Sequence, residues 1–136
     1  DKINETKHLE VVDELKRRLN NLKNKKILIL GATFKENCPD LRNTKVFDLV
    51  KALLSYGMKT TIVDYLVDPL EARETYQLDV VGEIPAGERF SAVICAVAHN
   101  KFVTIQTSEW QKLLKEKAVL IDLKGIMPRA LKALRI

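Results

Sequence analysis

A polar loop between two apolar segments holds the residues of this chain that are best suited to bind an anion. The loop runs from Gly31 to Thr44 and contains Lys35 and Arg42, whose cationic groups are common ligands of phosphate oxygens. It lacks the G-x-G-x-x-G spacing of dinucleotide-binding loops and the Gly-Lys-Ser/Thr motif of nucleoside triphosphatases. We therefore expect an anion site of another kind, with the N-terminus of the following helix behind the two cations.

Cysteine and histidine chemistry has little support in the sequence. Cys38 lies in this loop, but no histidine adjoins it, so we do not expect it to act as a nucleophile. Cys95 lies in an apolar segment and is expected to be a small buried side chain. The cysteines form no C-x-x-C pair, and we predict no metal site. For His99, a pocket-lining role and a packing or capping role are equally consistent with the sequence.

Two aspartates also follow apolar segments. Asp64 would bind a ribose in an ordinary dinucleotide-binding domain, but without the glycine pattern we expect it to form the turn towards Pro69. Asp122 is expected to cap or orient the loop that follows it. Both residues are therefore predicted to shape loops rather than to react.

The segments between these residues alternate between helical and extended patterns. Apolar residues at helical spacing predict a long amphipathic helix over 2–22 and shorter helices over 45–56, 69–75 and 107–114. Apolar or β-branched segments predict strands over 25–31, 59–64, 79–81, 92–98 and 118–122. We expect segment 92–98 at the centre of the sheet and a final helical turn or two within 128–134.

This order of elements predicts an α/β fold, a Rossmann-like doubly wound parallel sheet of about five strands preceded by the long amphipathic helix. In such sheets ligands bind beyond the carboxyl ends of the strands, where the polar loops would meet. A receiver domain has a similar pattern, but its chemistry needs an acidic pair after the first strand and an aspartate after the central one. Ala32-Thr33 and His99-Asn100 occupy these places, so we reject that alternative.

The composition is that of one globular domain. A length of 136 residues suits a single core, and 46% hydrophobic with 30% charged residues excludes a disordered chain. No apolar stretch is long enough to span a membrane, and the first ten residues lack the apolar stretch of a signal peptide. Together with the sparse cysteines, this favours a cytoplasmic protein without a membrane partner.

The net charge of +5 is concentrated between Lys16 and Lys26, a segment with six basic and no acidic residues. Nucleic-acid sites commonly interleave aromatic residues with such charges, and none occurs in this segment. We therefore interpret it as a solvated helix end and expect no nucleic-acid partner.

The loop sequence Gly31-Ala-Thr-Phe-Lys-Glu-Asn-Cys-Pro-Asp-Leu-Arg-Asn-Thr44 resembles the segment that opens the C-terminal, UDP-binding domain of the UDP-glucose/GDP-mannose dehydrogenase family. Its F-K-E-N-C-P-D-x-R-N form is most similar to the branch that oxidises UDP-N-acetylhexosamines to uronic acids for surface polysaccharides. Segments 64–69, 96–102 and 121–125 also match, and the first helix is similar to the end of the family's connecting helix.

The resemblance implies that the chain is the nucleotide-sugar-binding part of an NAD-dependent UDP-sugar 6-dehydrogenase, which oxidises the sugar C6 alcohol to a carboxylate. Residues 1–22 would end the connecting helix, and 23–136 would form the UDP-binding domain of an enzyme that is a homodimer. The family's NAD-binding domain and catalytic cysteine precede this part. We therefore expect no catalytic residue here, and an inactive chain on its own.

The resemblance also implies roles for four residues. Phe34 and Lys35 would contact the UDP-sugar, with Lys35 at the diphosphate. Lys124 stands where the family often has an arginine near the nucleotide-sugar, and Arg42 would reach across the domain cleft to NAD. The alternative is a stand-alone small α/β nucleotide-binding or regulatory module, which should not begin within a helix whose apolar face needs a partner.

Overall fold

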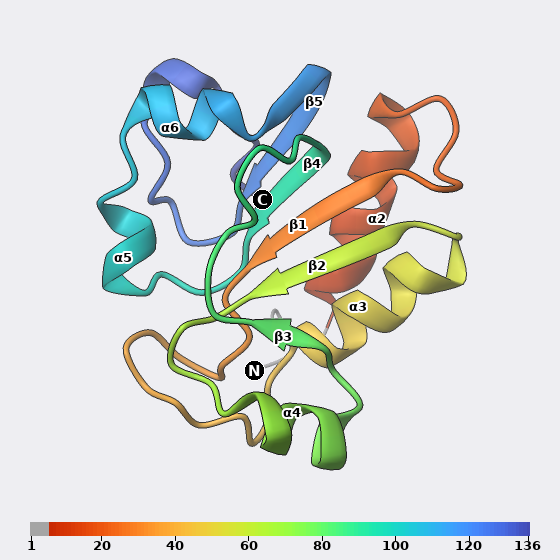
Figure 1. Cartoon of the computed structure of the whole chain (residues 1–136). Helices are drawn as coiled ribbons and strands as arrows, with labels where there is room; N and C mark the ends of the chain where they lie inside the picture. The colour runs from red at the N-terminus through yellow and green to blue at the C-terminus, as the bar shows by residue number, and fades with distance from the viewer. Residues whose placement is uncertain (1–5) are drawn as a thin grey trace.

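The computed structural model describes residues 6–136. Five parallel strands form one sheet in the order β3-β2-β1-β4-β5 (Figure 1). The strands are β1 (Lys26–Leu30), β2 (Lys59–Val63), β3 (Val80–Val81), β4 (Phe90–Cys95) and β5 (Leu114–Asp122). The helices are α2 (Lys7–Arg18), α3 (Val46–Ser55), α4 (Pro69–Tyr76), α5 (Asn100–Val103) and α6 (Thr107–Lys112), and a 3-10 turn covers Arg129–Leu131. The predicted fold class is confirmed.

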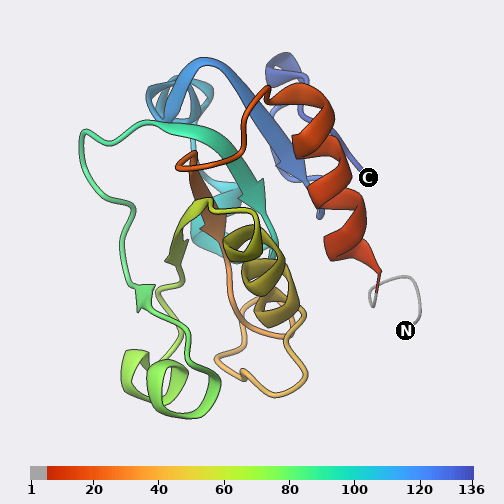
Figure 2. The same cartoon turned by 90° about the vertical axis from the view of Figure 1, so that its right-hand side faces the viewer.

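Two apolar cores cover the two faces of the sheet. Successive side chains of a strand point to opposite faces. Ile27 and Ile29 of β1 accordingly pack in the core that holds α2 and α3, whereas Leu28 and Leu30 pack in the core that holds α5 and α6. Figure 2 shows α2 and α3 together along one face of the sheet. Burial on both faces explains why the segment of β1 is a continuous apolar run.

Gly31 allows the exit of β1 to approach the exit of β4. Its φ is +97°, in the region that L side chains rarely adopt, and a Cβ placed there would lie 2.5 Å from the Cβ of Val97. The first loop therefore leaves the sheet in direct contact with the loop after β4, which brings the two loops into one site.

The first helix is shorter than predicted. It spans Lys7–Arg18 rather than 2–22, and residues 2–5 of the prediction lie outside the described part. The chain turns extended at Leu19 (φ −109°, ψ 126°), whose side chain is buried in the same core as α2. Leu19 and Leu22 thus pack on the core from a segment that is not helical, although their spacing in the sequence looks helical.

Other predictions of the elements also need correction. The centre of the sheet is β1, with β4 beside it, and the chain leaves β4 after Cys95, so residues 96–98 lie outside the strand. Helix α5 was not predicted because four residues are too few for a periodic pattern. Strand β5 begins at Leu114, four residues before the predicted start. Within residues 6–136, no helix has the length and apolar character needed to cross a bilayer.

Candidate functional site

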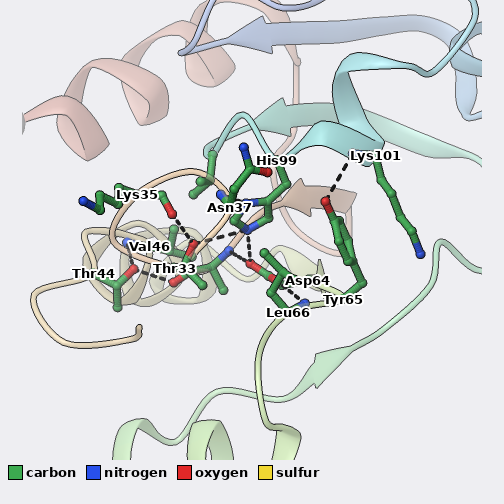
Figure 3. Close-up of polar contacts among 12 residues, drawn as sticks. Thr33, Lys35, Asn37, Thr44, Val46, Asp64, Tyr65, Leu66, His99 and Lys101 are labelled. Atoms are coloured by element: carbon green, nitrogen blue, oxygen red, sulfur yellow. Dashed lines mark hydrogen bonds and ion pairs between the residues drawn. The ribbon is translucent and has the colours of Figure 1, made fainter. Parts of the chain in front are cut away.

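The carboxyl ends of four strands bring the predicted polar residues to one edge of the sheet. The first loop follows β1, Asp64 follows β2, His99 lies beyond β4, and Asp122 ends β5. Side chains of the first loop converge with Asp64 and His99, as Figure 3 shows. At the edge of the sheet where we expected a ligand, the loops after β1, β2 and β4 are therefore also hydrogen-bonded to one another.

Asp64 ties the turn after β2 to the first loop. Its carboxylate is 1% exposed and accepts hydrogen bonds from the amide of Ala32 (2.7 Å), the amide of Leu66 (2.9 Å) and Nε2 of His99 (2.8 Å). Burial favours the neutral carboxyl, but the hydrogen bonds outweigh it and hold the pKa of Asp64 below its ordinary value. Asp64 thus forms the predicted turn, and it also fixes the start of the first loop.

His99 is completely buried and takes the packing role. Its Nδ1 accepts a hydrogen bond from the backbone amide of Asn37 (2.9 Å). The hydroxyl of Thr33 lies 3.2 Å from Nε2 and donates to the carbonyl of Lys35 (2.9 Å). The imidazole therefore contacts the first loop on both of its nitrogens and does not line the pocket described next.

A pocket of about 100 Å³ lies beside this buried cluster, between the first loop, α2, α3 and the exits of β4 and β5. Two of the predicted ligand residues, Phe34 and Lys124, line it. Three further cationic or titratable residues line the pocket although no sequence pattern pointed to them, namely Lys7, His8 and Lys45. The remaining lining residues are Val11, Thr33, Val46, Leu49, Ala96, Val97 and Leu123.

Three lysines line the pocket, and two of them have no carboxylate partner among the described residues. Among the described residues, Lys45 and Lys124 have no acidic partner within 4.0 Å, whereas Lys7 pairs with Glu10 at 3.0 Å. Lys45 directly precedes α3, so its ammonium adds to the partial positive charge of this helix N-terminus, where the hydroxyl of Thr44 accepts from the amide of Val46 (3.2 Å). Lysines and a helix N-terminus together favour an anionic ligand.

Lys35 and Arg42 do not line this pocket. The Lys35 side chain is exposed and extends away from the buried cluster (Figure 3). The Arg42 side chain is 82% exposed and pairs with Asp40, with Nη2 and Oδ2 3.0 Å apart. Hydrogen bonds from Arg42 place the pKa of Asp40 below its ordinary value. These bonds use Nε and Nη2 of Arg42, so Nη1 faces solvent with donors that an external anion can bind.

The loop that carries Lys124 is shaped by Asp122. This carboxylate is 1% exposed and accepts from the amides of Ile126 (3.1 Å) and Met127 (2.8 Å). The predicted orienting role of Asp122 is confirmed. These bonds hold the loop through its backbone amides, and the side chain of Lys124 stays exposed at the pocket.

The cysteines are free and differ in their surroundings. Cys95 is buried, and burial raises the pKa of its thiol to about 12, so this thiol stays protonated at neutral pH. Cys38 is partly exposed in the first loop. Within residues 6–136, no three metal-binding side chains lie close enough together to hold an ion.

The basic segment 16–26 is largely engaged with other parts of the chain. Arg17 and Arg18 both pair with Glu14 one turn earlier in α2. Lys26 pairs with Glu88 at 2.7 Å, and the ammonium of Lys16 lies 4.4 Å from the centre of the Tyr56 ring. The Arg17 and Arg18 side chains nevertheless stay 70% and 48% exposed, which agrees with the interpretation of a solvated helix end.

Comparison with known proteins gives the geometry a family context. The sequence model of the UDP-glucose/GDP-mannose dehydrogenase family, UDP binding domain, matches residues 28–129. The chain belongs to this family. The match includes the first loop and the loop of Lys124, the two segments that meet at the pocket. It favours the interpretation as a dehydrogenase domain over a stand-alone module.

Relatives of the family cover most of this chain. A UDP-N-acetyl-D-glucosamine 6-dehydrogenase of Salmonella typhi is 42% identical over 108 residues, which are 79% of this chain and 25% of that protein. The protein of the same name from Pseudomonas aeruginosa is 38% identical over 122 residues, 90% of this chain and 28% of that protein. The chain thus spans about a quarter of the length of the curated relatives it matches.

Solved structures share the fold. The crystal structure of NDP-N-acetyl-D-galactosaminuronic acid dehydrogenase from Methanosarcina mazei Go1 superposes with a TM-score of 0.78 at 18% identity, over 95% of this chain and 27% of that one. The native structure of the UDP-N-acetyl-mannosamine dehydrogenase Cap5O from Staphylococcus aureus gives 0.72 at 24% identity, over 93% and 29%.

Proposed function

We propose that this chain binds the nucleotide part of a UDP-sugar for an NAD-dependent UDP-sugar 6-dehydrogenase, whose substrate is a UDP-N-acetylhexosamine. The observation that carries the proposal is the convergence of Phe34 and Lys124, from loops far apart in the sequence, on one lysine-rich pocket. The family match and the names of the Salmonella typhi and Pseudomonas aeruginosa relatives support it. The reaction would oxidise the sugar C6 alcohol to a carboxylate, with two hydrides passing to NAD and one water consumed.

The pocket suits the diphosphate and an adjoining part of the ligand. Its volume of about 100 Å³ is below the range of about 300–1,000 Å³ that encloses a drug-sized ligand. We therefore place the diphosphate among Lys7, Lys45 and Lys124, and an adjoining ring against Phe34, whose side chain is 52% exposed. The rest of the UDP-sugar would extend beyond this chain.

Lys35 would act at the mouth of the pocket. Its carbonyl is held by Thr33 while its ammonium is free to move, so the side chain can turn towards a diphosphate that occupies the pocket. Lys35 and the pocket lysines would then share the ligand charge as point charges, because a lysine ammonium lacks the bidentate fork of arginine.

Arg42 is the residue of this chain that we propose contacts NAD. The first loop has one glycine, Gly31, where dinucleotide-binding loops have three, so NAD would be held mainly by a domain outside this chain. The exposed guanidinium of Arg42 fits a phosphate of that cofactor, which would bind the donors that Asp40 does not use. NAD would supply the hydride acceptor, and no residue of this chain would take part in the hydride transfer.

The remaining features of the proposed enzyme concern its assembly. We propose that residues 1–22 belong to a helix that connects this domain to the NAD-binding domain, and that 23–136 form the UDP-binding domain. The enzyme would be a cytoplasmic homodimer. Leu9 of α2 is 54% exposed although it is apolar, which is consistent with contacts outside this chain.

Titration calorimetry with UDP, uridine and GDP tests the proposal. We expect UDP to bind more tightly than uridine, because the lysines act on the diphosphate, and more tightly than GDP. Lys45→Gln should weaken UDP binding, whereas Lys51→Gln, within α3 and outside the pocket lining, should not. Equal affinity for UDP and uridine, or equal effects of the two substitutions, would contradict the proposal.

A further inference from the structure

The tip of the first loop, residues 33–37, contacts one buried side chain, that of His99, at both of its ends. His99 is 0% exposed, and its Nδ1 accepts the backbone N–H of Asn37 at 2.9 Å. The Thr33 hydroxyl lies 3.2 Å from Nε2 and donates to the carbonyl of Lys35. The two ends of the tip therefore rest on the two nitrogens of a single imidazole, and Phe34 and Lys35 lie between them.

These contacts determine where the proton of His99 sits. A backbone amide is a donor, so the nitrogen that receives it, Nδ1, must carry a lone pair and no proton. The neutral ring then has its proton on Nε2, which lies 2.8 Å from Oδ2 of Asp64. Asp64 is itself fixed by the amides of Ala32 and Leu66. The arrangement therefore selects one tautomer and one orientation of the ring.

The side chain of Asn37 adds a second connection to the same place. Its Nδ2 donates to Oδ1 of Asn100 (3.1 Å), and its Oδ1 accepts from the amide of Asn100 (3.0 Å). Asn37 has a φ of 58°, a left-handed conformation that costs energy for a residue other than glycine. Backbone and side chain together hold this conformation against the start of α5.

We infer that His99 is a positioning residue for nucleotide binding, which in its neutral Nε2–H tautomer anchors the loop tip through Asn37 and so presents Phe34 and Lys35 to the ligand. The inference rests on the proposed function. His99 does not touch the ligand; it acts through the loop. Histidine suits this role because one rigid ring supplies an acceptor for the loop and a donor for the buried carboxylate of Asp64.

The tautomer can be observed directly in the 136-residue chain without ligand. In a ¹⁵N-labelled sample we expect Nδ1 of His99 to resonate as an unprotonated nitrogen and Nε2 as a protonated one. A scalar coupling across the N–H···N hydrogen bond should join the Asn37 amide to Nδ1. A protonated Nδ1, or the absence of that coupling in a folded sample, would overturn the inference.

Two substitutions separate positioning from a general contribution to stability. His99→Asn retains an acceptor near the position of Nδ1 but loses the donor to Asp64. His99→Gln can still donate to Asp64 but lacks a rigid acceptor for Asn37. Both should lower the melting temperature, because each removes a buried hydrogen bond.

Only His99→Gln should release the loop tip. We expect faster hydrogen exchange of the Asn37 amide and about tenfold weaker UDP binding, the effect of one buried hydrogen bond, while His99→Asn stays within about threefold of the wild type. Equal weakening by both variants would assign His99 to stability alone and overturn the inference. If the wild type fails to bind UDP, the proposed function fails, and the coupling and exchange measurements still decide whether His99 holds the loop.

Discussion

Replacing Asp64 by asparagine tests how much the buried carboxylate contributes. Asparagine has the same shape but offers one acceptor oxygen and one donor group in place of two acceptor oxygens. With its oxygen in the Oδ2 position, it keeps the bonds from Ala32 and His99 but turns its NH₂ towards the amide of Leu66. With the opposite orientation it loses two bonds instead of one, so the first orientation is preferred.

The magnitude follows from this count. One hydrogen bond to a charged acceptor contributes about 1.5–3 kcal/mol, and the two that remain become neutral and weaker. We therefore expect Asp64→Asn to lower the free energy of unfolding by about 2–4 kcal/mol at neutral pH, a large part of the stability of a single domain. Urea unfolding of both proteins, followed by circular dichroism, measures this difference.

The pH dependence provides the sharper test. The pKa of Asp64 is depressed in the folded chain, so its contribution is complete above the unfolded value, near 3.8, and is lost as the pH falls through the folded value. The difference between wild type and Asp64→Asn should therefore stay level near neutral pH and shrink as the pH falls from about 5 to about 2. Asp40, whose pKa is also depressed, is present in both proteins and cancels. A difference that stays constant over this range would refute the reasoning.

Three further predictions follow from the geometry. Gly31→Ala should destabilise the chain by about 2–4 kcal/mol in thermal unfolding, because alanine is strained at the positive φ and its Cβ would clash with Val97. Gly82→Ala, with open space around it, should have little effect, and equal effects of the two substitutions would contradict this prediction. Lys124→Gln should weaken UDP binding about fivefold in calorimetry, because it removes about 1 kcal/mol of charge interaction. Lys115→Gln, outside the pocket lining, should leave the affinity unchanged, and an equal loss of affinity in both variants would count against the pocket as the UDP site. In the complete enzyme, Arg42→Gln should raise the KM for NAD while the affinity for UDP stays unchanged, and the opposite pattern would reassign Arg42 to the substrate.

The sheet was predictable because its strands are covered on both faces. Ile27, Leu28, Ile29 and Leu30 are all buried, and a continuous apolar run reports this directly. Helix ends were less predictable. Leu19 is buried from an extended segment, so its spacing in the sequence looks helical although the helix has already ended.

The site was predictable in part, for a different reason. Phe34 and Lys124 were found because their loops resemble family segments, and the fold then brings them to one pocket. Lys45 was missed although the start of α3 was predicted to within one residue, because its approach to the pocket depends on how α2, α3 and the first loop pack together. The bond between Asn37 and His99 joins residues 62 positions apart, and no local pattern announces such a contact.

The central claim is that the lysine-rich pocket at the carboxyl edge of the sheet is the UDP site. Nuclear magnetic resonance titration of the ¹⁵N-labelled chain with UDP tests this most directly, because each amide reports its own surroundings. The account predicts that shifts concentrate at Phe34, Lys45 and Lys124. A separate groove on the chain is lined by Arg18, Lys117 and Lys132. Shifts confined to that groove, or no shifts in a folded sample, would contradict the claim.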